Sequence, residues 1–120
     1  MESKNEFGKL GEQKAEEFLR AKGYNILERN YRYLMAEIDI IAKKDDILVI
    51  VEVKSSNIGL LKDISDVGDR RKVNLLIIAT GNYVLENNVD CEVRFDVITL
   101  VKIGDKVMVK EHLENAYFYF

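Results

Sequence analysis

Two runs of β-branched and apolar residues, separated by a short polar segment, constrain the fold of this 120-residue chain more than any other feature. The runs are residues 36–43 (AEIDIIAK) and 47–54 (ILVIVEVK), and both have the composition of β-strands. The segment between them, KKDD at 43–46, is typical of a turn. The sequence therefore predicts an antiparallel hairpin.

The hairpin gathers its charged residues at one end of one face. A two-residue turn sets Asp39 directly opposite Glu52. A four-residue turn pairs Glu37 with Glu52 instead and leaves Asp39 diagonal to it. Because side chains alternate between the faces of a strand, either register brings Asp39 and Glu52 to the same face as Lys54. The other face of the first strand is predicted to be apolar and to carry Ala36, Ile38, Ile40 and Ala42.

Two carboxylates and a lysine at this spacing are suited to one kind of chemistry. Directly opposed residues have Cβ atoms about 5 Å apart, and like charges there repel each other. Hard cations such as Mg²⁺ bind carboxylate oxygens together with several waters. A bound metal beside a lysine suits the hydrolysis of phosphodiesters. An ordinary salt-bridged sheet surface explains the same residues, and the spacing alone favours that simpler interpretation.

The rest of the chain predicts an α/β domain. An amphipathic helix is expected over residues 6–22, ended by Gly23, and a second helix over 69–88 has an apolar face broad enough to be buried on more than one side. Further strands are expected at 24–33, 92–102 and 106–112, and a loop at 55–68. There is no proline, repeat or linker, so residues 1–120 are expected to form one domain with a central mixed sheet of about five strands flanked by helices.

Composition limits the classes of partner. The chain has 18 basic and 21 acidic residues and a net charge of −3, which is not the balance of a protein that coats nucleic acid. A carboxylate cluster that binds metal contributes to this count, so a nuclease is not excluded. The single cysteine, the charged N-terminus and the absence of a run near the ~18 apolar residues of a membrane span favour a cytoplasmic protein.

Several separate motifs resemble one family. The segments GKLGEQKAEEFLRAKGYNILERNYR, AEIDIIAKKDDILVIVEVK, RFDVITL and EHLENAY occur in this order and look like the YraN-like family of uncharacterised bacterial proteins. That family is placed in the PD-(D/E)XK nuclease superfamily, which includes restriction endonucleases and archaeal Holliday junction resolvases. The resemblance covers nearly the whole chain and implies a restriction-endonuclease-like fold.

The resemblance also implies roles for individual residues. Asp39 corresponds to the first metal-binding acid, and Glu52 and Lys54 to the (D/E)-X-K half of the signature. Glu12 resembles an acid on the first helix that assists through a water molecule. The implied catalytic residues are therefore Glu12, Asp39, Glu52 and Lys54, with Mg²⁺ or Mn²⁺ bound by Asp39 and Glu52. Arg94 and Asp96 match a family motif of unknown role.

The most basic run in the chain is Arg70, Arg71 and Lys72, and Lys72 also matches a basic position of the family. A cationic run is unfavourable near a helix N-terminus, so phosphate contact is an attractive explanation. A solvated helix face is at least as good an explanation. We name these three residues as the candidate nucleic-acid-binding positions.

Three functions remain open from the sequence. The leading hypothesis is a Mg²⁺-dependent endonuclease that acts on DNA, with branched or damaged DNA as the candidate substrate. The second is a nucleic-acid-binding module without catalysis, which the acidic net charge favours, together with Ser55-Ser56 where the family often has threonine and arginine. The third is an interaction subunit that binds through the aromatic tail at 117–120. A resolvase-like activity would need a homodimer, because a four-way junction requires two cuts.

Overall fold

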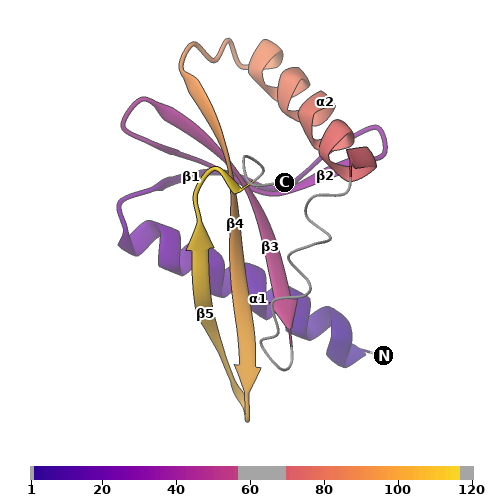
Figure 1. The fold of residues 1–120 in the computed structure, drawn as a ribbon, viewed down its shortest axis with the longest axis vertical. Helices are drawn as coiled ribbons and strands as arrows, with labels where there is room; N and C mark the ends of the chain where they lie inside the picture. Colours follow the sequence, from indigo (N-terminus) through magenta and orange to yellow (C-terminus); the bar gives the residue numbers. More distant parts are fainter. Residues whose placement is uncertain (1, 57–69, 117–120) are drawn as a thin grey trace.

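The computed structural model describes residues 2–56 and 70–116. Two helices and five strands follow one another along the chain, as Figure 1 shows. In chain order they are α1 (Glu2–Ala21), β1 (Asn25–Tyr33), β2 (Ala36–Lys44), β3 (Ile47–Ser56), α2 (Arg70–Glu86), β4 (Glu92–Ile103) and β5 (Lys106–Leu113). Every predicted helix and strand is present. The expected loop at 55–68 begins later than predicted, since Ser55 and Ser56 still belong to β3, and its remainder lies outside the described residues.

The five strands form one mixed sheet in the order β1-β2-β3-β4-β5. All neighbouring strands are antiparallel except β3 and β4, which are parallel and lie on either side of α2 in the sequence. The predicted α/β class and five-stranded mixed sheet are therefore confirmed. Lys44 pairs with Ile47, so the β2–β3 hairpin has the two-residue turn at Asp45-Asp46 rather than the four-residue alternative.

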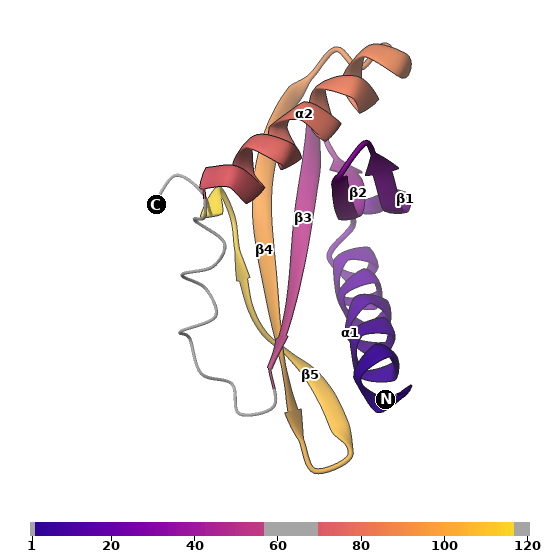
Figure 2. The same cartoon turned by 90° about the vertical axis from the view of Figure 1, so that its right-hand side faces the viewer.

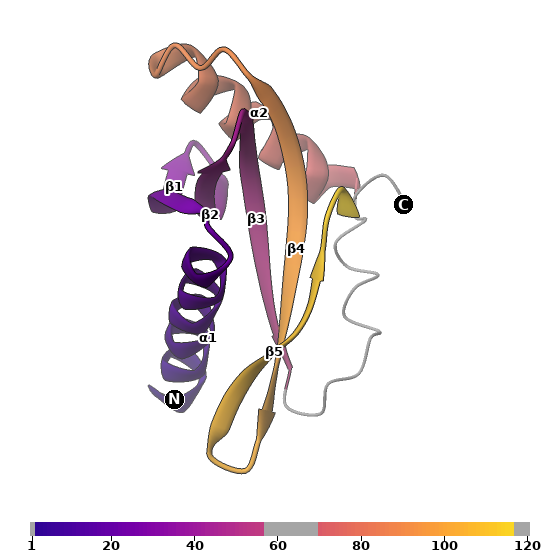
Figure 3. The same ribbon diagram turned by 90° about the vertical axis from the view of Figure 1, so that its left-hand side faces the viewer.

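The helices cover opposite faces of the sheet. Ala15 and Leu19 of α1 pack with Val49 and Val51 in one core cluster, whereas Leu76 of α2 packs in a second cluster with alternate residues of β3. Figure 2 shows α2 in front of β3 and β4, and Figure 3, the view from the opposite side, shows α2 behind them. A parallel strand covered on both faces carries an unbroken apolar run, which explains the sequence ILVIV at the start of β3.

The predicted apolar face of β2 is wrong in the first half of the strand. Ile40 and Ala42 belong to the α1-side cluster as expected, but Ala36 and Ile38 pack in the α2-side cluster. The register with β3 runs from Lys44 to Ile40, whereas the register with β1 continues to Ala36. The first residues of β2 are thus paired with β1, and a two-stranded ribbon twists more strongly than a full sheet.

The expectation that α2 is buried on more than one side is also wrong. Its buried residues are Leu76, Ala79, Thr80 and Tyr83, which form a single face. Ile77 and Ile78 are about half exposed, at 52% and 51%. The broad apolar surface that the sequence shows therefore does not correspond to a broad buried surface. Neither α1 nor α2, in the described part of the chain, combines the length and apolarity needed to span a bilayer.

The Arg94–Asp96 motif forms a buried polar cluster that joins distant parts of the chain. Asp96 is 1% exposed and accepts two hydrogen bonds from Arg94, at 2.9 and 2.8 Å, and one from the amide of Asn115 at 3.2 Å. The Nε2 atom of His112 lies 2.8 Å from Asp96, and Arg94 also donates to the hydroxyl of Tyr24 at 2.7 Å. The cluster ties β4 and β5 to the segment that follows α1, so the motif has a structural role.

The close approach of α1 to the sheet depends on a glycine. Gly11 is buried, and a Cβ atom there would lie 2.5 Å from the Oγ atom of Ser55 on β3. The lack of a side chain lets α1 cross the end of β3, and it brings the next residue, Glu12, toward the charged end of the hairpin. Gly23 has a φ of +93° just after the helix, which is the expected role of a glycine at this position.

Candidate active site

Glu52 is the buried anion at the centre of the candidate site. It follows the apolar run of β3 and is 7% exposed, although its side chain carries a carboxylate. Two lysines compensate it: the Nζ atom of Lys72 lies 2.6 Å from its Oε2 atom, and that of Lys54 lies 3.5 Å away. Burial would lower the pKa of Lys72, but the hydrogen bond and ion pair with Glu52 outweigh burial and raise it.

Asp39 lies on β2 beside Glu52, as the hairpin predicts. The pairing of β2 with β3 ends with Ile40 opposite Val51, so Asp39 and Glu52 are the residues just beyond the last pair. Both line the same cavity. The Oδ2 atom of Asp39 accepts a hydrogen bond of 2.8 Å from the amide of Val53. This bond fixes the carboxylate against β3 where the strands begin to diverge.

Asp39 is poised to bind a proton or a cation. Burial raises its pKa to about 7, and the charge of Glu52 adds to this effect. The amide of Val53 opposes the rise, while the charges of Glu12 and Glu37 contribute further to it. The charges of three other carboxylates thus act on Asp39, so a positive charge near it would be favourable.

Glu12 belongs to an outer acidic group that contacts β1. Its Oε1 atom lies 3.3 Å from the Nη2 atom of Arg29, which also pairs with Glu16 at 3.0 Å. With its amide oriented to satisfy its hydrogen bonds, Asn30 donates to Glu12 at 3.2 Å and to Glu37 at 3.1 Å. Asn30 therefore links the acid of α1 to the acid of β2.

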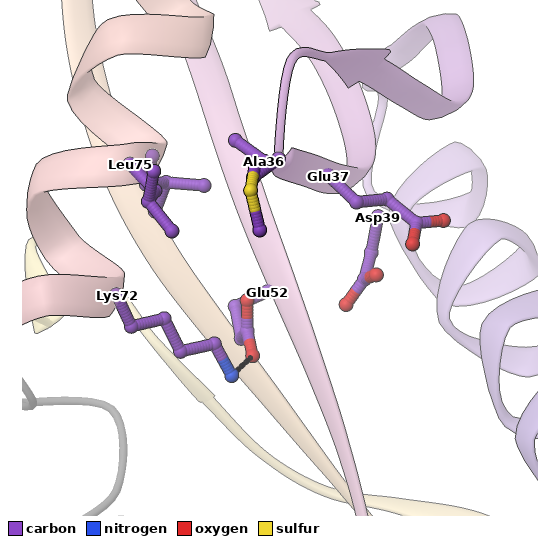
Figure 4. A pocket seen from close by; sticks show the side chains of 8 residues that line it. Ala36, Glu37, Asp39, Glu52, Lys72 and Leu75 are labelled. Carbon is purple, nitrogen blue, oxygen red and sulfur yellow. Dashed lines mark ion pairs between the residues drawn. The ribbon is translucent and has the colours of Figure 1, made fainter.

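A cavity of about 230 Å³ opens over these groups. Figure 4 shows Lys72 reaching from α2 to Glu52, with Asp39 and Glu37 on the other side of the space. Leu75 of α2 and Met35 from the β1–β2 turn contribute apolar walls. The cavity thus combines a charged floor with apolar walls and is open to a ligand that has both characters.

Comparison with known proteins identifies the family. Residues 11–100 match the uncharacterised protein family UPF0102. The chain belongs to this family. A UPF0102 protein from Christiangramia forsetii is 43% identical over the full length of both chains, and one from Flavobacterium psychrophilum is also 43% identical over the full length of both. A UPF0102 protein from Persephonella marina is 40% identical over 92% of this chain and 91% of its own. The family indicated by the sequence motifs is therefore confirmed.

The carboxylates of this UPF0102 protein fit a hard cation that keeps most of its water ligands better than a cation whose ligands all come from the protein. Among the described residues, no three histidine, cysteine, aspartate or glutamate side chains are grouped closely enough to chelate a metal. Asp39 and Glu52 remain as a pair of carboxylates, and burial together with the charge of Glu52 raises the pKa of Asp39. Mg²⁺ keeps several waters and often takes only one or two carboxylates from a protein. The pair therefore suits Mg²⁺ or Mn²⁺ by its donor chemistry.

The structure brings some of the predicted site residues together and separates others. Asp39, Glu52 and Lys54 form one cluster, and Lys72 joins it by its ion pair rather than pointing away from it. Glu12 stands outside the cavity lining, with Arg29 as its ionic partner, but its charge acts on Asp39. Arg70 and Arg71 are exposed at the start of α2.

Sequence reasoning overlooked two residues of this region. Asn30 has a φ of +55° within β1, and its amide links Glu12 and Glu37. An asparagine in the middle of a strand was the available signal, because asparagine is depleted in strands and tolerates positive φ. Met35 also lines the cavity. The sequence places Met35 only in the turn before β2, and the twist of β2, which brings this turn to the cavity, cannot be read from the sequence.

Replacing Lys72 by methionine is expected to lower the free energy of unfolding by about 1–3 kcal/mol, because it leaves the buried carboxylate of Glu52 with less compensation. Arg70→Met is the matched control, since Arg70 is exposed on the same helix. Urea unfolding of both variants at neutral pH measures the difference. Equal losses in the two variants would show that the Lys72–Glu52 pair does not stabilise the fold.

Proposed function

We propose that this UPF0102 protein is a cytoplasmic, metal-dependent endonuclease that hydrolyses DNA phosphodiester bonds and has the restriction-endonuclease-like fold of the PD-(D/E)XK superfamily. The observation that carries the proposal is the buried Glu52 beside the half-buried Asp39, with a lysine at 3.5 Å and another at 2.6 Å from Glu52. Phosphodiester hydrolysis needs fixed charges around a developing pentavalent phosphate, and this site supplies them.

Each side chain has a distinct task in this scheme. Asp39 and Glu52 would hold Mg²⁺ or Mn²⁺, which supplies positive charge at the scissile phosphate. Lys54 lies beside Glu52 and is placed to orient the attacking water or to offset charge on the phosphate oxygens. Glu12 adds negative charge at the rim and favours a cation at Asp39. Lys72 contacts Glu52 and is placed to move to a phosphate oxygen when the metal is bound.

The alternative function is a nucleic-acid-binding module without catalysis. The specific observation in its favour is that two lysines already neutralise Glu52, one of them at 2.6 Å. Such a module would bind DNA in the presence of chelator and would retain this binding when Asp39 is replaced. A nuclease would lose cleavage under the same changes.

A cleavage assay tests the proposal. Wild-type protein and the Asp39→Ala variant are incubated with linear, single-stranded and four-way-junction DNA, with Mg²⁺, Mn²⁺ or chelator. We expect cleavage by the wild type that falls by at least about 100-fold in the variant, because a metal ligand is lost. Asp46→Ala is the matched control, since Asp46 is an exposed acid in the turn at the other end of the same hairpin.

Three results would each count against the proposal: no cleavage by the wild type, equal cleavage by Asp39→Ala, or cleavage that persists in chelator. DNA binding without cleavage, unchanged in Asp39→Ala, would favour the binding module. The preferred DNA among the three substrates would show whether branched structures are the target.

A further inference from the structure

The turn between β1 and β2 presents two large apolar side chains to solvent. Tyr33 pairs with Ala36, so the connection consists of Leu34 and Met35 alone. Leu34 is 80% exposed and Met35 is 86% exposed. Side chains this exposed contribute almost nothing to the hydrophobic stabilisation of the fold. Their apolar character is therefore not explained by packing within the described part of the chain.

The backbone of the turn gives a second reason to look for a role outside folding. Leu34 has a φ of +56°, in the left-handed region. Two-residue hairpin turns favour glycine, asparagine or aspartate at such positions, and a bulky residue there is strained. Strain of this kind persists where a residue is needed for something other than stability. Leucine at this position is thus unfavourable both for solvation and for backbone conformation.

The turn lies directly beside the candidate active site. Met35 lines the same cavity as Asp39 and Glu52. Glu37, on the strand that follows the turn, also lines this cavity and lies beside Asp39 in Figure 4. At the base of the turn, Arg32 has a side chain that is 77% exposed, and its Nη2 atom lies 3.6 Å from the Oε1 atom of Glu37. Lys72 lies on the other side of the cavity. Arg32 and Lys72 thus each pair with a carboxylate of the candidate site, Lys72 with Glu52 at 2.6 Å. An anionic polymer with apolar faces could contact the apolar turn and exchange its phosphates for these carboxylates.

We propose that Leu34 and Met35 form an apolar wedge that inserts between the bases of DNA whose phosphate lies over Asp39 and Glu52. This inference rests on the proposed function and specifies its substrate. Proteins that distort DNA insert leucine, methionine or similar side chains between base steps and unstack them. The wedge makes base steps that are already weakly stacked, as at branch points, the preferred sites, because they cost less to open.

The test replaces the wedge without disturbing the fold. In the double variant Leu34→Asn with Met35→Ser, asparagine suits a positive φ, so thermal unfolding should be unchanged or raised. Leu85→Ser is the matched control, since Leu85 is 79% exposed on α2. Duplex and four-way-junction DNA that carry 2-aminopurine report unstacking by fluorescence, in chelator so that no cleavage is needed. We expect a fluorescence rise with the wild type and with Leu85→Ser, and none with the double variant.

Cleavage gives the second readout. The double variant should lose about tenfold or more of its activity on duplex DNA and retain most of its activity on single strands, where nothing must be unstacked. The wedge is overturned if the double variant gives the same fluorescence rise and the same duplex cleavage as the wild type. A wild type that binds none of these DNAs, or a dimer that dissociates only in the double variant, would also overturn it.

The two proposals can fail separately. A fluorescence rise that needs the wedge, without cleavage by the wild type, would support the wedge and remove the nuclease. Cleavage that is lost in Asp39→Ala but unchanged in the double variant, with the fluorescence rise also unchanged, would support the nuclease and refute the wedge.

Discussion

Replacing Asp96 by alanine is expected to lower the free energy of unfolding by about 3–5 kcal/mol, because it removes the anion from a buried cluster of donors. The side chain of Asp96 is 0% exposed, while those of Arg94 and His112 are 16% and 4% exposed. Without Asp96, the guanidinium of Arg94 and the ring of His112 would lose the buried anion that accepts their hydrogen bonds. Equilibrium unfolding in urea at neutral pH measures the loss.

Glu114→Ala is the matched control for this prediction. The Oε1 atom of Glu114 lies 3.7 Å from the Nη1 atom of Arg94, and its side chain is 53% exposed. Removing this exposed partner should cost less than about 1 kcal/mol. A similar loss in both variants would show that burial of Asp96 adds nothing to the strength of the cluster.

The stability difference between wild type and Asp96→Ala is also expected to depend on pH. Burial alone would raise the pKa of Asp96, but hydrogen bonds from His112 and Arg94 lower it below its ordinary value. A carboxyl group whose pKa is depressed on folding stabilises the protein above the pKa it has when unfolded, roughly 3.9. This contribution is lost as the pH falls through the folded value, so the gap between wild type and Asp96→Ala should narrow in acid.

The hairpin could be predicted from the sequence because its determinants are local. The period of two along a strand and the length of a turn predict which residues face each other. The two-residue turn is confirmed, and Asp39 and Glu52 lie just beyond the last β2–β3 pair. The change of face at Ile38 could not be predicted, since it depends on where β3 stops pairing with β2. Local pattern therefore predicts that Asp39 and Glu52 are neighbours but not the twist that brings Met35 to the same cavity.

The other structural features that the sequence did not predict depend on contacts between segments far apart in the chain. Lys72 reaches Glu52 from a helix 20 residues further along, and Arg94 meets Tyr24 across a separation of 70 residues. Neither contact leaves a periodic trace in the sequence. Ile77 and Ile78 are as apolar as Leu76, but the position of the sheet determines that Leu76 is buried and that the two isoleucines are half exposed.

The charged end of the hairpin and the Asp96 cluster use buried carboxylates in opposite ways. Asp96 accepts hydrogen bonds from His112, Arg94 and the amide of Asn115, and its pKa is lowered. Asp39 has carboxylates around it, and its pKa is raised to about 7. A carboxylate that folding makes harder to ionise lowers the stability of the protein, so an arrangement of this kind is typical of a site built for binding or catalysis.

Replacing Asp39 by asparagine is therefore expected to stabilise the fold in mildly alkaline solution. Asparagine can still accept the hydrogen bond from the amide of Val53 but carries no charge beside Glu52. Because folding raises the pKa of Asp39, the folded wild type binds more protons than the unfolded chain between about pH 4 and 7, and its stability declines over this range. The variant lacks this decline. We expect an advantage near zero at about pH 4.5 that grows to about 1–3 kcal/mol at about pH 8.

Urea unfolding of wild type and variant at a series of pH values measures this gap, with Asp46→Asn as the matched control, because Asp46 is exposed in the β2–β3 turn.

The same difference in unfolding free energy is then measured at alkaline pH with and without millimolar Mg²⁺ or Mn²⁺. A cation that binds the folded wild type stabilises it in proportion to RT ln(1 + [L]/Kd), and a variant without the Asp39 charge should gain much less. The gap should therefore narrow when metal is added. A gap that does not change with pH would refute the raised pKa of Asp39, and a gap that metal leaves unchanged would remove Asp39 from the proposed metal ligands.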